Sequence, residues 1–243
     1  MKKNIELYFD TELSDFFRVK SGISYPLDRR ASIKDIIEAQ GVPHTEVGEI
    51  FVDDCPVNFS FIASGGQKVI IKAVQAPFEI FKPSLLRPNS FKNMRFVVDV
   101  NVGKLAPLLR MMGYDTFFDN ELRDKEIVLL AHEQKRVVLS RDRALLKHGL
   151  IEFGRLIRSQ KSDEQLKEVT AFFGLNCEMI YTRCMRCNHL LREVKKEQIV
   201  HRLEPKTKKY FYRFSICHGC DRIYWPGSHW EKMNKLMKIA RIC

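Results

Sequence analysis

Four cysteines near the C-terminal end of the chain form two C-x-x-C pairs, Cys184 with Cys187 and Cys217 with Cys220. Four thiolates in two such pairs are the ligand set of a closed, tetrahedral structural zinc site. A single pair could be a redox motif, but two pairs without a secretion signal favour metal binding over a disulfide framework. The sequence therefore predicts a zinc ribbon whose strands lie around residues 194–200 and 210–214.

A second set of residues suited to metal chemistry is acidic. Asp99 closes an apolar run that begins at Arg95, Asp124 follows the next apolar stretch, and Asp142 comes just after Ser140. Ligands of parallel sheets bind beyond the carboxyl ends of the strands, where these side chains would meet. Carboxylates there can hold Mg²⁺ or Mn²⁺ and share it with a substrate phosphate. Such ions can activate water for phosphodiester cleavage, so the three aspartates are the candidate catalytic residues.

The three acids also have a structural interpretation, because aspartate often caps the first turn of a helix. Asp124 and Asp142 both suit that role. Asp99 suits it less, since it ends an apolar strand, where a carboxylate is costly unless paired or metal-bound. The cations around the acids could hold phosphates or could form a solvated basic face; they are Lys104, Arg110, Arg141 and Arg143.

Charge is distributed unevenly along the chain, whose formal net charge is +11. Residues 1–83 hold 10 Lys and Arg against 12 Asp and Glu, whereas residues 84–243 hold 31 against 18. Only the second part is therefore suited to a polyanion. Lys206, Lys208 and Lys209 precede an aromatic run at 210–212, a combination typical of single-stranded nucleic-acid binding, unless the aromatics pack the ribbon core.

The N-terminal part has its own order of expected strands and helices. We expect a strand over 3–9 and an extended stretch over 17–27. Ser32 and Asp35 resemble a capping box that opens a helix, and Gly41 ends that helix. Short strands are expected over 50–53, 59–62 and 68–74. This order predicts a ubiquitin-like β-grasp domain over residues 1–78.

The central part alternates strands with helices. Pro77, Pro83 and Pro88 fall within twelve residues that show no helical or alternating pattern, which marks residues 79–93 as a linker. Strands are then expected over 95–100, 114–118, 136–140 and 151–159, and helices over 104–112, 124–134, 143–148 and 162–174, with Ser162 as N-cap of the last. This alternation predicts a three-layer α/β domain with a parallel sheet over 94–182, followed by the zinc ribbon and tail over 183–243. No apolar run approaches the length of a membrane span, so a cytoplasmic protein is expected.

Several motifs carry a family resemblance. They are Arg95-Phe-Val-Val-Asp99, Gly103-Lys-Leu-Ala106, Met112-Gly-Tyr-Asp115, Asp124-Lys-Glu126 and Ser140-Arg-Asp-Arg143, with Tyr224-Trp-Pro-Gly-Ser-His229-Trp230 near the end. Together they resemble the PIN-like ribonuclease family named after the C-terminal domain of the Mut-seven exonuclease, over residues 94–243. In that family a ubiquitin-like domain often precedes the nuclease. The resemblance implies a metal-dependent RNase whose acids match Asp99, Asp124 and Asp142.

The chain departs from the family pattern at two places. Leu108-Leu109-Arg110 stands where the family usually has Trp-Leu-Arg, and Ser140 stands for a threonine, which keeps a hydroxyl. The first change puts local packing in doubt, but the acids are kept. The ubiquitin-like segment also resembles sulfur-carrier proteins, which end in Gly-Gly. Here the chain continues beyond Pro77, so carrier chemistry is disfavoured.

Two functional hypotheses remain from the sequence. The first is a ribonuclease that uses structural Zn²⁺ and catalytic Mg²⁺ or Mn²⁺ on single-stranded or structured RNA, such as tRNA or rRNA. The second is a non-catalytic RNA-binding adaptor in which the acids only cap helices and the ribbon binds RNA. The ubiquitin-like domain is expected to stabilise the chain or to dock a protein partner. A cluster of bare carboxylates favours the nuclease, because it would weaken a pure RNA binder.

Overall fold

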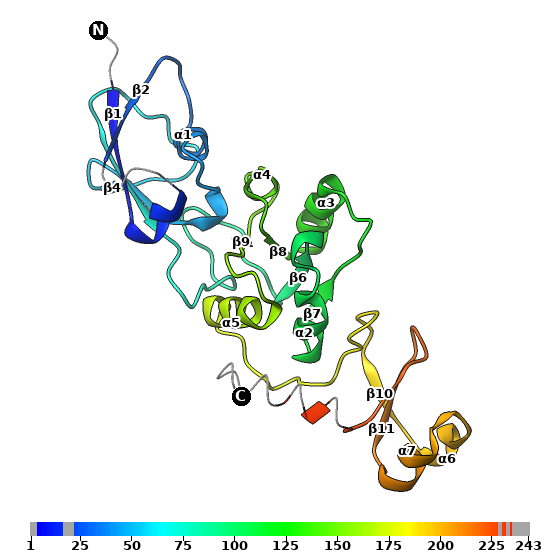
Figure 1. The fold of residues 1–243 in the computed structure, drawn as a ribbon. Coiled ribbons are helices and arrows are strands. Elements are labelled where there is room, and N and C mark those ends of the chain that lie inside the picture. The colour runs from blue at the N-terminus through cyan, green and yellow to red at the C-terminus, as the bar shows by residue number, and fades with distance from the viewer. Residues whose placement is uncertain (1–3, 17–21, 228–229, 232–233, 235–243) are drawn as a thin grey trace.

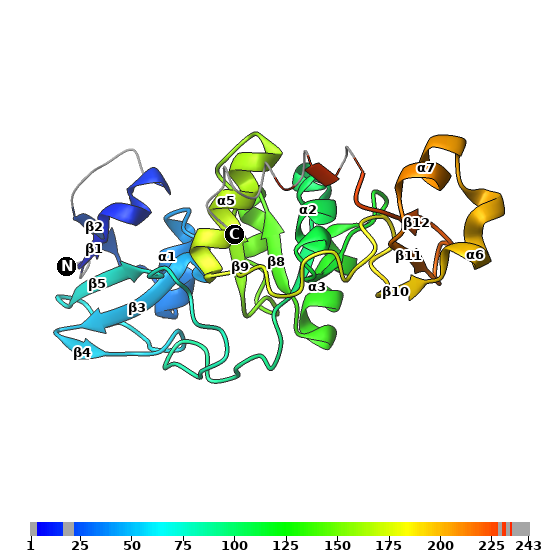
Figure 2. The ribbon, with the colours of Figure 1, turned by 90° about the horizontal axis from the view of Figure 1, so that it is seen from below.

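The structure, a computed structural model, describes residues 4–16, 22–227, 230–231 and 234. Three parts follow one another along the molecule: an N-terminal β-rich domain, a central α/β domain and a C-terminal ribbon (Figures 1 and 2). None of the helices in this described part is long and apolar enough to cross a membrane.

The N-terminal domain is a five-stranded sheet of order β2-β1-β5-β3-β4. Its strands are β1 (Asn4–Phe9), β2 (Ile23–Pro26), β3 (Val47–Val52), β4 (Cys55–Pro56) and β5 (Lys68–Ala73). The outer strands run antiparallel to their neighbours, whereas β1 and β5 are parallel. Two 3-10 helices lie in the connections between these strands: η1 (Thr11–Phe16) follows β1, and η2 (His44–Glu46) precedes β3. This arrangement confirms the predicted ubiquitin-like fold.

Helix α1 (Ile33–Ala39) begins as the sequence predicted. The Ser32 hydroxyl accepts the Asp35 amide, and the Asp35 carboxylate accepts the Ser32 amide and hydroxyl, so the capping box is complete. Gly41, just after the helix, has a φ of 99°, which a glycine adopts without strain. The strand predicted over 59–62 is wrong, since only Ile62 pairs, in a single bridge with Ser32. The nearest strand, β4, lies just before that range, at Cys55–Pro56.

The central domain holds a parallel sheet of order β7-β6-β8-β9. The strands are β6 (Arg95–Val98), β7 (Asp115–Phe117), β8 (Val137–Ser140) and β9 (Gly154–Leu156). The helices are η3 (Val100–Val102), α2 (Leu105–Met111), α3 (Asp124–Gln134), α4 (Arg143–Leu146) and α5 (Ser162–Phe173). Helix α5 begins one residue earlier than predicted, because Lys161, and not Ser162, occupies the N-cap position.

Both faces of this sheet are buried, which explains why its strands are continuously apolar. Phe96, Val98 and Leu139 pack on one face with residues of α2 and α5. Val97 and Val138 point to the other face and pack with residues of α3 and α4. The domain is therefore the predicted three-layer α/β arrangement, with helices on each side of one parallel sheet.

The segment over 79–93, predicted as a linker, forms no helix or strand but is packed. Ile80 and Phe91 are buried in the core beneath α2 and α5. Arg87 is 4% exposed, and its guanidinium donates to the carbonyls of His44, Thr45, Val47 and Glu152. The segment is thus a strap that joins the N-terminal domain to the central one.

The ribbon holds β10 (Leu191–Val194), β11 (Phe214–Cys217) and β12 (Ile223–Tyr224) in one antiparallel sheet. The strands predicted over 194–200 and 210–214 are misplaced. Residues in those ranges form α6 (Lys196–Ile199), η4 (Val200–Arg202) and the end of α7 (Pro205–Tyr210), while the strands flank the cysteines directly. The ribbon core is small, with Ile199, Leu203 and Phe214 as its buried apolar residues.

Candidate metal centre and nuclease site

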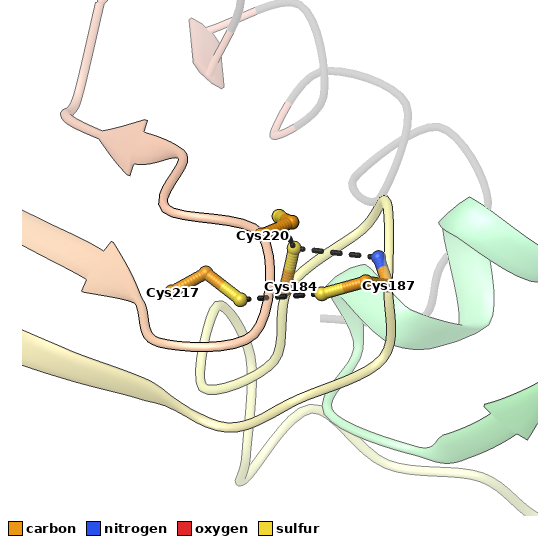
Figure 3. A group of neighbouring side chains, drawn as sticks. All are labelled: Cys184, Cys187, Cys217 and Cys220. Carbon is orange, nitrogen blue, oxygen red and sulfur yellow. Dashed lines mark hydrogen bonds between the residues drawn. The ribbon is translucent and has the colours of Figure 1, made fainter.

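The four cysteines of the two C-x-x-C pairs come together at the base of the ribbon (Figure 3). Their sulfur atoms all lie within 4.8 Å of one another, with Sγ of Cys184 3.6 Å from that of Cys220 and Sγ of Cys187 3.2 Å from that of Cys217. Zinc bonded to four sulfurs at about 2.3 Å places them about 3.8 Å apart. The four thiols therefore fit the predicted zinc site.

The thiols are in unequal surroundings before any metal binds. Burial opposes ionisation of Cys184, but hydrogen bonds from the Tyr224 hydroxyl and from the Cys187 and Arg186 amides lower the pKa of its thiol to about 6. Burial raises the pKa of the Cys187 thiol to about 12. Zinc binds thiolates, so the hydrogen bonds at Cys184 favour the form of this side chain that a metal needs.

Arg110 attaches this first cysteine pair to the central domain. Its side chain is 4% exposed, and its guanidinium donates to the carbonyls of Thr116, Met185 and Arg186. Burial lowers the pKa of this guanidinium, but the charge remains. The prediction that Arg110 binds substrate does not agree with this position, since its donors face backbone oxygens of β7 and of the loop that holds Cys184 and Cys187.

Asp99 lies at the carboxyl end of β6, where it is 5% exposed. Its Oδ2 accepts hydrogen bonds from the Ser140 hydroxyl, at 2.6 Å, and from the side-chain amide of Asn101. Within the described part of the chain, no cation forms an ion pair with Asp99. A buried carboxylate held only by neutral donors is a costly arrangement, and a bound cation would relieve that cost.

Asp142 is connected to Asp99 through Ser140, whose hydroxyl also accepts the Asp142 amide at 2.8 Å. The Asp142 carboxylate caps α4, because its Oδ1 accepts the amides of Ala144 and Leu145. Asp142 therefore has the helix-capping role that was its alternative interpretation. It also lies close to Asp99, because both residues contact the Ser140 hydroxyl.

Asp124 is exposed at the first turn of α3, whose N-cap is Arg123. Helix α3 packs against β6 and β8. Among the residues that the structure describes, the four cysteines are the one group of three or more His, Cys, Asp or Glu side chains close enough to share a metal ion. The three aspartates each follow the carboxyl end of a strand, β6, β7 or β8, and in the part of the chain that the structure describes only Asp99 and Asp142 are linked to each other, through Ser140.

The other predicted phosphate-binding residues occupy three places. Lys104 and Arg141 are exposed beside the Asp99 loop, and the Arg141 amide donates to Asn101. Arg143 is exposed, with its guanidinium 4.8 Å from the centre of the Phe16 ring. Lys206, Lys208 and Lys209 lie on α7, at the end of the ribbon away from the central domain (Figure 2).

Sequence reasoning missed Asn101, which bridges the site. Its amide nitrogen donates to Asp99 and reaches the Ser140 hydroxyl at 3.4 Å, and its oxygen accepts the Arg141 amide. The spacing of Asp99 and Asn101 directly after an apolar strand was the available signal. His229, which belongs to the C-terminal motif of the family resemblance, lies outside the described residues.

Comparison with known families agrees with this architecture. The model of the Mut7-C RNAse domain matches residues 94–237, and the model of the Mut7-C ubiquitin domain matches residues 2–79. No curated protein and no solved structure matches the chain. The RNase model covers more than half of the chain, and the order of the two domains is the one expected from the sequence. The chain therefore belongs to the Mut7-C RNase family, with its ubiquitin-like domain in front.

Proposed function

We propose that this protein is a metal-dependent ribonuclease whose catalytic cation is held at Asp99, with Asp142 and Asp124 beside it. The observation that carries the proposal is the Asp99 carboxylate, which is buried at a strand end and whose partners among the described residues are neutral. Family membership supports RNase activity generally. The carboxylate chemistry favours Mg²⁺ or Mn²⁺, both of which bind oxygen ligands.

The residues at and around Asp99 would have different roles in the reaction. Asp99 would bind the cation directly, while Asn101 and Ser140 hold its carboxylate in one orientation through their hydrogen bonds. When bound, the cation supplies activation of water and stabilisation of the leaving oxygen. Lys104 and Arg141, both exposed beside this loop, would hold substrate phosphates.

The test compares Asp99→Asn with Asp119→Asn. Both changes remove one carboxylate charge, but Asp119 is exposed and follows a different strand. We expect Asp99→Asn to abolish manganese-dependent cleavage of labelled RNA, since the amide cannot replace the charge that holds the cation. Asp119→Asn should keep most of the activity. Cleavage by Asp99→Asn at the wild-type rate would contradict the proposed site.

The same experiment decides between the nuclease and the RNA-binding adaptor. An adaptor would bind RNA without cleaving it in Mn²⁺ or Mg²⁺, and Asp99→Asn would alter only stability. A nuclease variant should lose cleavage while RNA affinity, measured without added divalent ions, stays similar or rises slightly, because repulsion between carboxylate and phosphate is relieved. Binding and cleavage are therefore measured on the same preparations.

A further inference from the structure

A cleft of about 620 Å³ lies where the central domain meets the first cysteine pair. One wall comes from the end of β7 and the residue after it, and the other comes from the two cysteine loops and β10. We call it the junction cleft, and the lining residues that matter for the argument are Phe117, Phe118, Arg186, His189, Arg192 and His218.

The charge of the junction cleft is of one sign. Among the described residues that line it, none is acidic, whereas four are arginines. Two of these arginines are committed to the fold: Arg110 to its three carbonyls, and Arg183 to the carbonyls of Gly113 and Asn188. Arg186 and Arg192 are exposed and, within the described residues, form no ion pair. The cleft thus holds two arginines that are available to a phosphate chain.

Apolar surface accompanies this charge. Phe117 and Phe118 are partly exposed in the cleft, and Leu190 is 57% exposed at its edge. Cations next to aromatic rings are the combination that binds single strands, with phosphates on the cations and bases on the rings. A volume of this size falls in the range of sites for small organic ligands, which accommodates the bases of a bound strand.

One lining residue of the junction cleft, Phe118, contacts the loop that follows Asp99. A Cβ on Gly103 would lie 2.4 Å from the Phe118 ring, so that ring rests directly on the backbone of Gly103. Gly103 is the C-cap of η3, whose N-cap is Asp99.

We propose that the junction cleft binds single-stranded RNA through Arg186 and Arg192 and delivers it to the Asp99 site. The proposal rests on the proposed ribonuclease function for its substrate class, but its test measures binding alone. It assigns to the zinc ribbon a direct role: the ribbon forms one wall of the substrate path, and the cysteine loop carries Arg186 between two zinc ligands.

The test measures binding of fluorescent oligo-uridine by anisotropy, in buffer without added magnesium or manganese, with intact RNA verified on a gel. Arg186→Ala with Arg192→Ala should weaken binding roughly tenfold for each lost charged contact. The slope of log affinity against log salt should fall by about 1.4, since each single-strand phosphate contact contributes about 0.7. Arg186→Lys with Arg192→Lys should retain most of the slope.

Matched variants make the result specific. Lys82→Ala with Lys92→Ala removes two exposed charges from the strap and should leave the slope unchanged. Zinc content is measured for every variant, and if Arg186→Ala loses zinc, Arg192→Ala alone decides. The proposal is overturned if the double arginine variant binds like wild type, or if only substitution of Lys206, Lys208 and Lys209 weakens binding.

Failure of this proposal can be distinguished from failure of the proposed function. Suppose that the wild-type protein cleaves RNA and needs Asp99 to do so, but the arginine variants bind RNA with unchanged affinity. This result would refute RNA binding in the junction cleft and keep the proposed nuclease function. Loss of affinity in the arginine variants of a protein that never cleaves RNA would keep the cleft and refute the nuclease.

Discussion

The same side-chain type performs different work at different positions of this molecule. Arg87 and Arg110 are buried and donate to backbone carbonyls, and burial lowers the pKa of Arg87 to about 10. Arg186 and Arg192 are exposed at the junction cleft. The composition does not distinguish buried from exposed arginines. The excess of basic residues therefore predicted a polyanion partner, but it could not identify which side chains would bind that partner.

Asp99 leads to a prediction about stability in addition to activity. Its buried negative charge should be relieved by a divalent cation, so we expect Mn²⁺ to raise the melting temperature of the wild-type protein. Asp99→Asn removes the charge, and the melting temperature should then no longer respond to Mn²⁺. Thermal unfolding with and without the ion checks this. An equal response in both proteins would mean that the ion binds elsewhere.

Arg110 leads to a second prediction. Arg110→Lys keeps the charge but cannot reach three separate carbonyls, so the free energy of unfolding should fall by about 1–3 kcal/mol. Because Met185 and Arg186 lose their donor, zinc should also dissociate faster into a chelator. Arg141→Lys, at an exposed position, is the matched control and should change neither quantity. If Arg110→Lys releases zinc at the wild-type rate, the Arg110 guanidinium does not help to retain the metal.

At the scale of elements, both edges of the central sheet are covered by neighbouring domains. At the β7 edge, the Asn188 side chain accepts the Thr116 amide and donates to Asp115. At the β9 edge, the Glu46 carboxylate accepts the Leu156 amide at 2.8 Å. An open strand edge invites association with other chains, and here one side chain from each flanking domain satisfies it.

Glu46 leads to a third prediction, because its carboxylate also pairs with Arg155 at 2.6 Å and is 1% exposed. Glu46→Ala leaves the Leu156 amide without its acceptor and leaves the Arg155 guanidinium only its longer contact with Glu168, at 3.8 Å, so the free energy of unfolding should fall by about 3 kcal/mol. Glu49→Ala, whose carboxylate is exposed and pairs with exposed Lys72, should cost less than about 1 kcal/mol. Urea unfolding compares the two, and equal losses would argue against the edge contact.

Zinc leads to a fourth prediction. Three buried apolar residues are too few to hold the ribbon together, so the metal should contribute much of its folding free energy. Cys184→Ser should release zinc and abolish amide protection over β10, β11 and β12, while β6 and β8 stay protected. Elemental analysis and hydrogen exchange check this, with Cys55→Ser, at an exposed cysteine, as the control. Wild-type protein without zinc would contradict the assignment.

What the sequence could predict depended on how local each signal was. The capping box at Ser32, the helix over 124–134 and the two cysteine pairs involve residues close together in the chain, and the structure agrees with them. The ribbon strands were misplaced because residues 194–200 mix apolar and charged side chains in a way that suits strand and helix alike. The partners of Asp99 depend on pairing of β6 with β8, which no local pattern contains.

At the scale of the whole molecule, the N-terminal domain and the central domain share one hydrophobic core. Ile37, Val42 and Val47 belong to the same buried cluster as Leu146 and Ile151. Hydrogen bonds cross the same boundary, from the His44 ring to the Ile151 carbonyl and from Lys147 to the Glu38 carbonyl. The ubiquitin-like domain is thus packed into the same core as the central domain.

This shared core leads to the last prediction, on the fragment 79–243 without the N-terminal domain. Removing residues 1–78 exposes Leu146, Ile151 and Leu156 and takes away three of the carbonyls that accept from buried Arg87. Exposed apolar surface and unpaired buried donors both favour aggregation, so the fragment should be insoluble when expressed alone. Co-expression of residues 1–78 as a separate chain should restore solubility, because the same surfaces can still meet. Solubility and size-exclusion chromatography check this, and a soluble, cooperatively unfolding fragment would mean that the nuclease domain is independent of its neighbour.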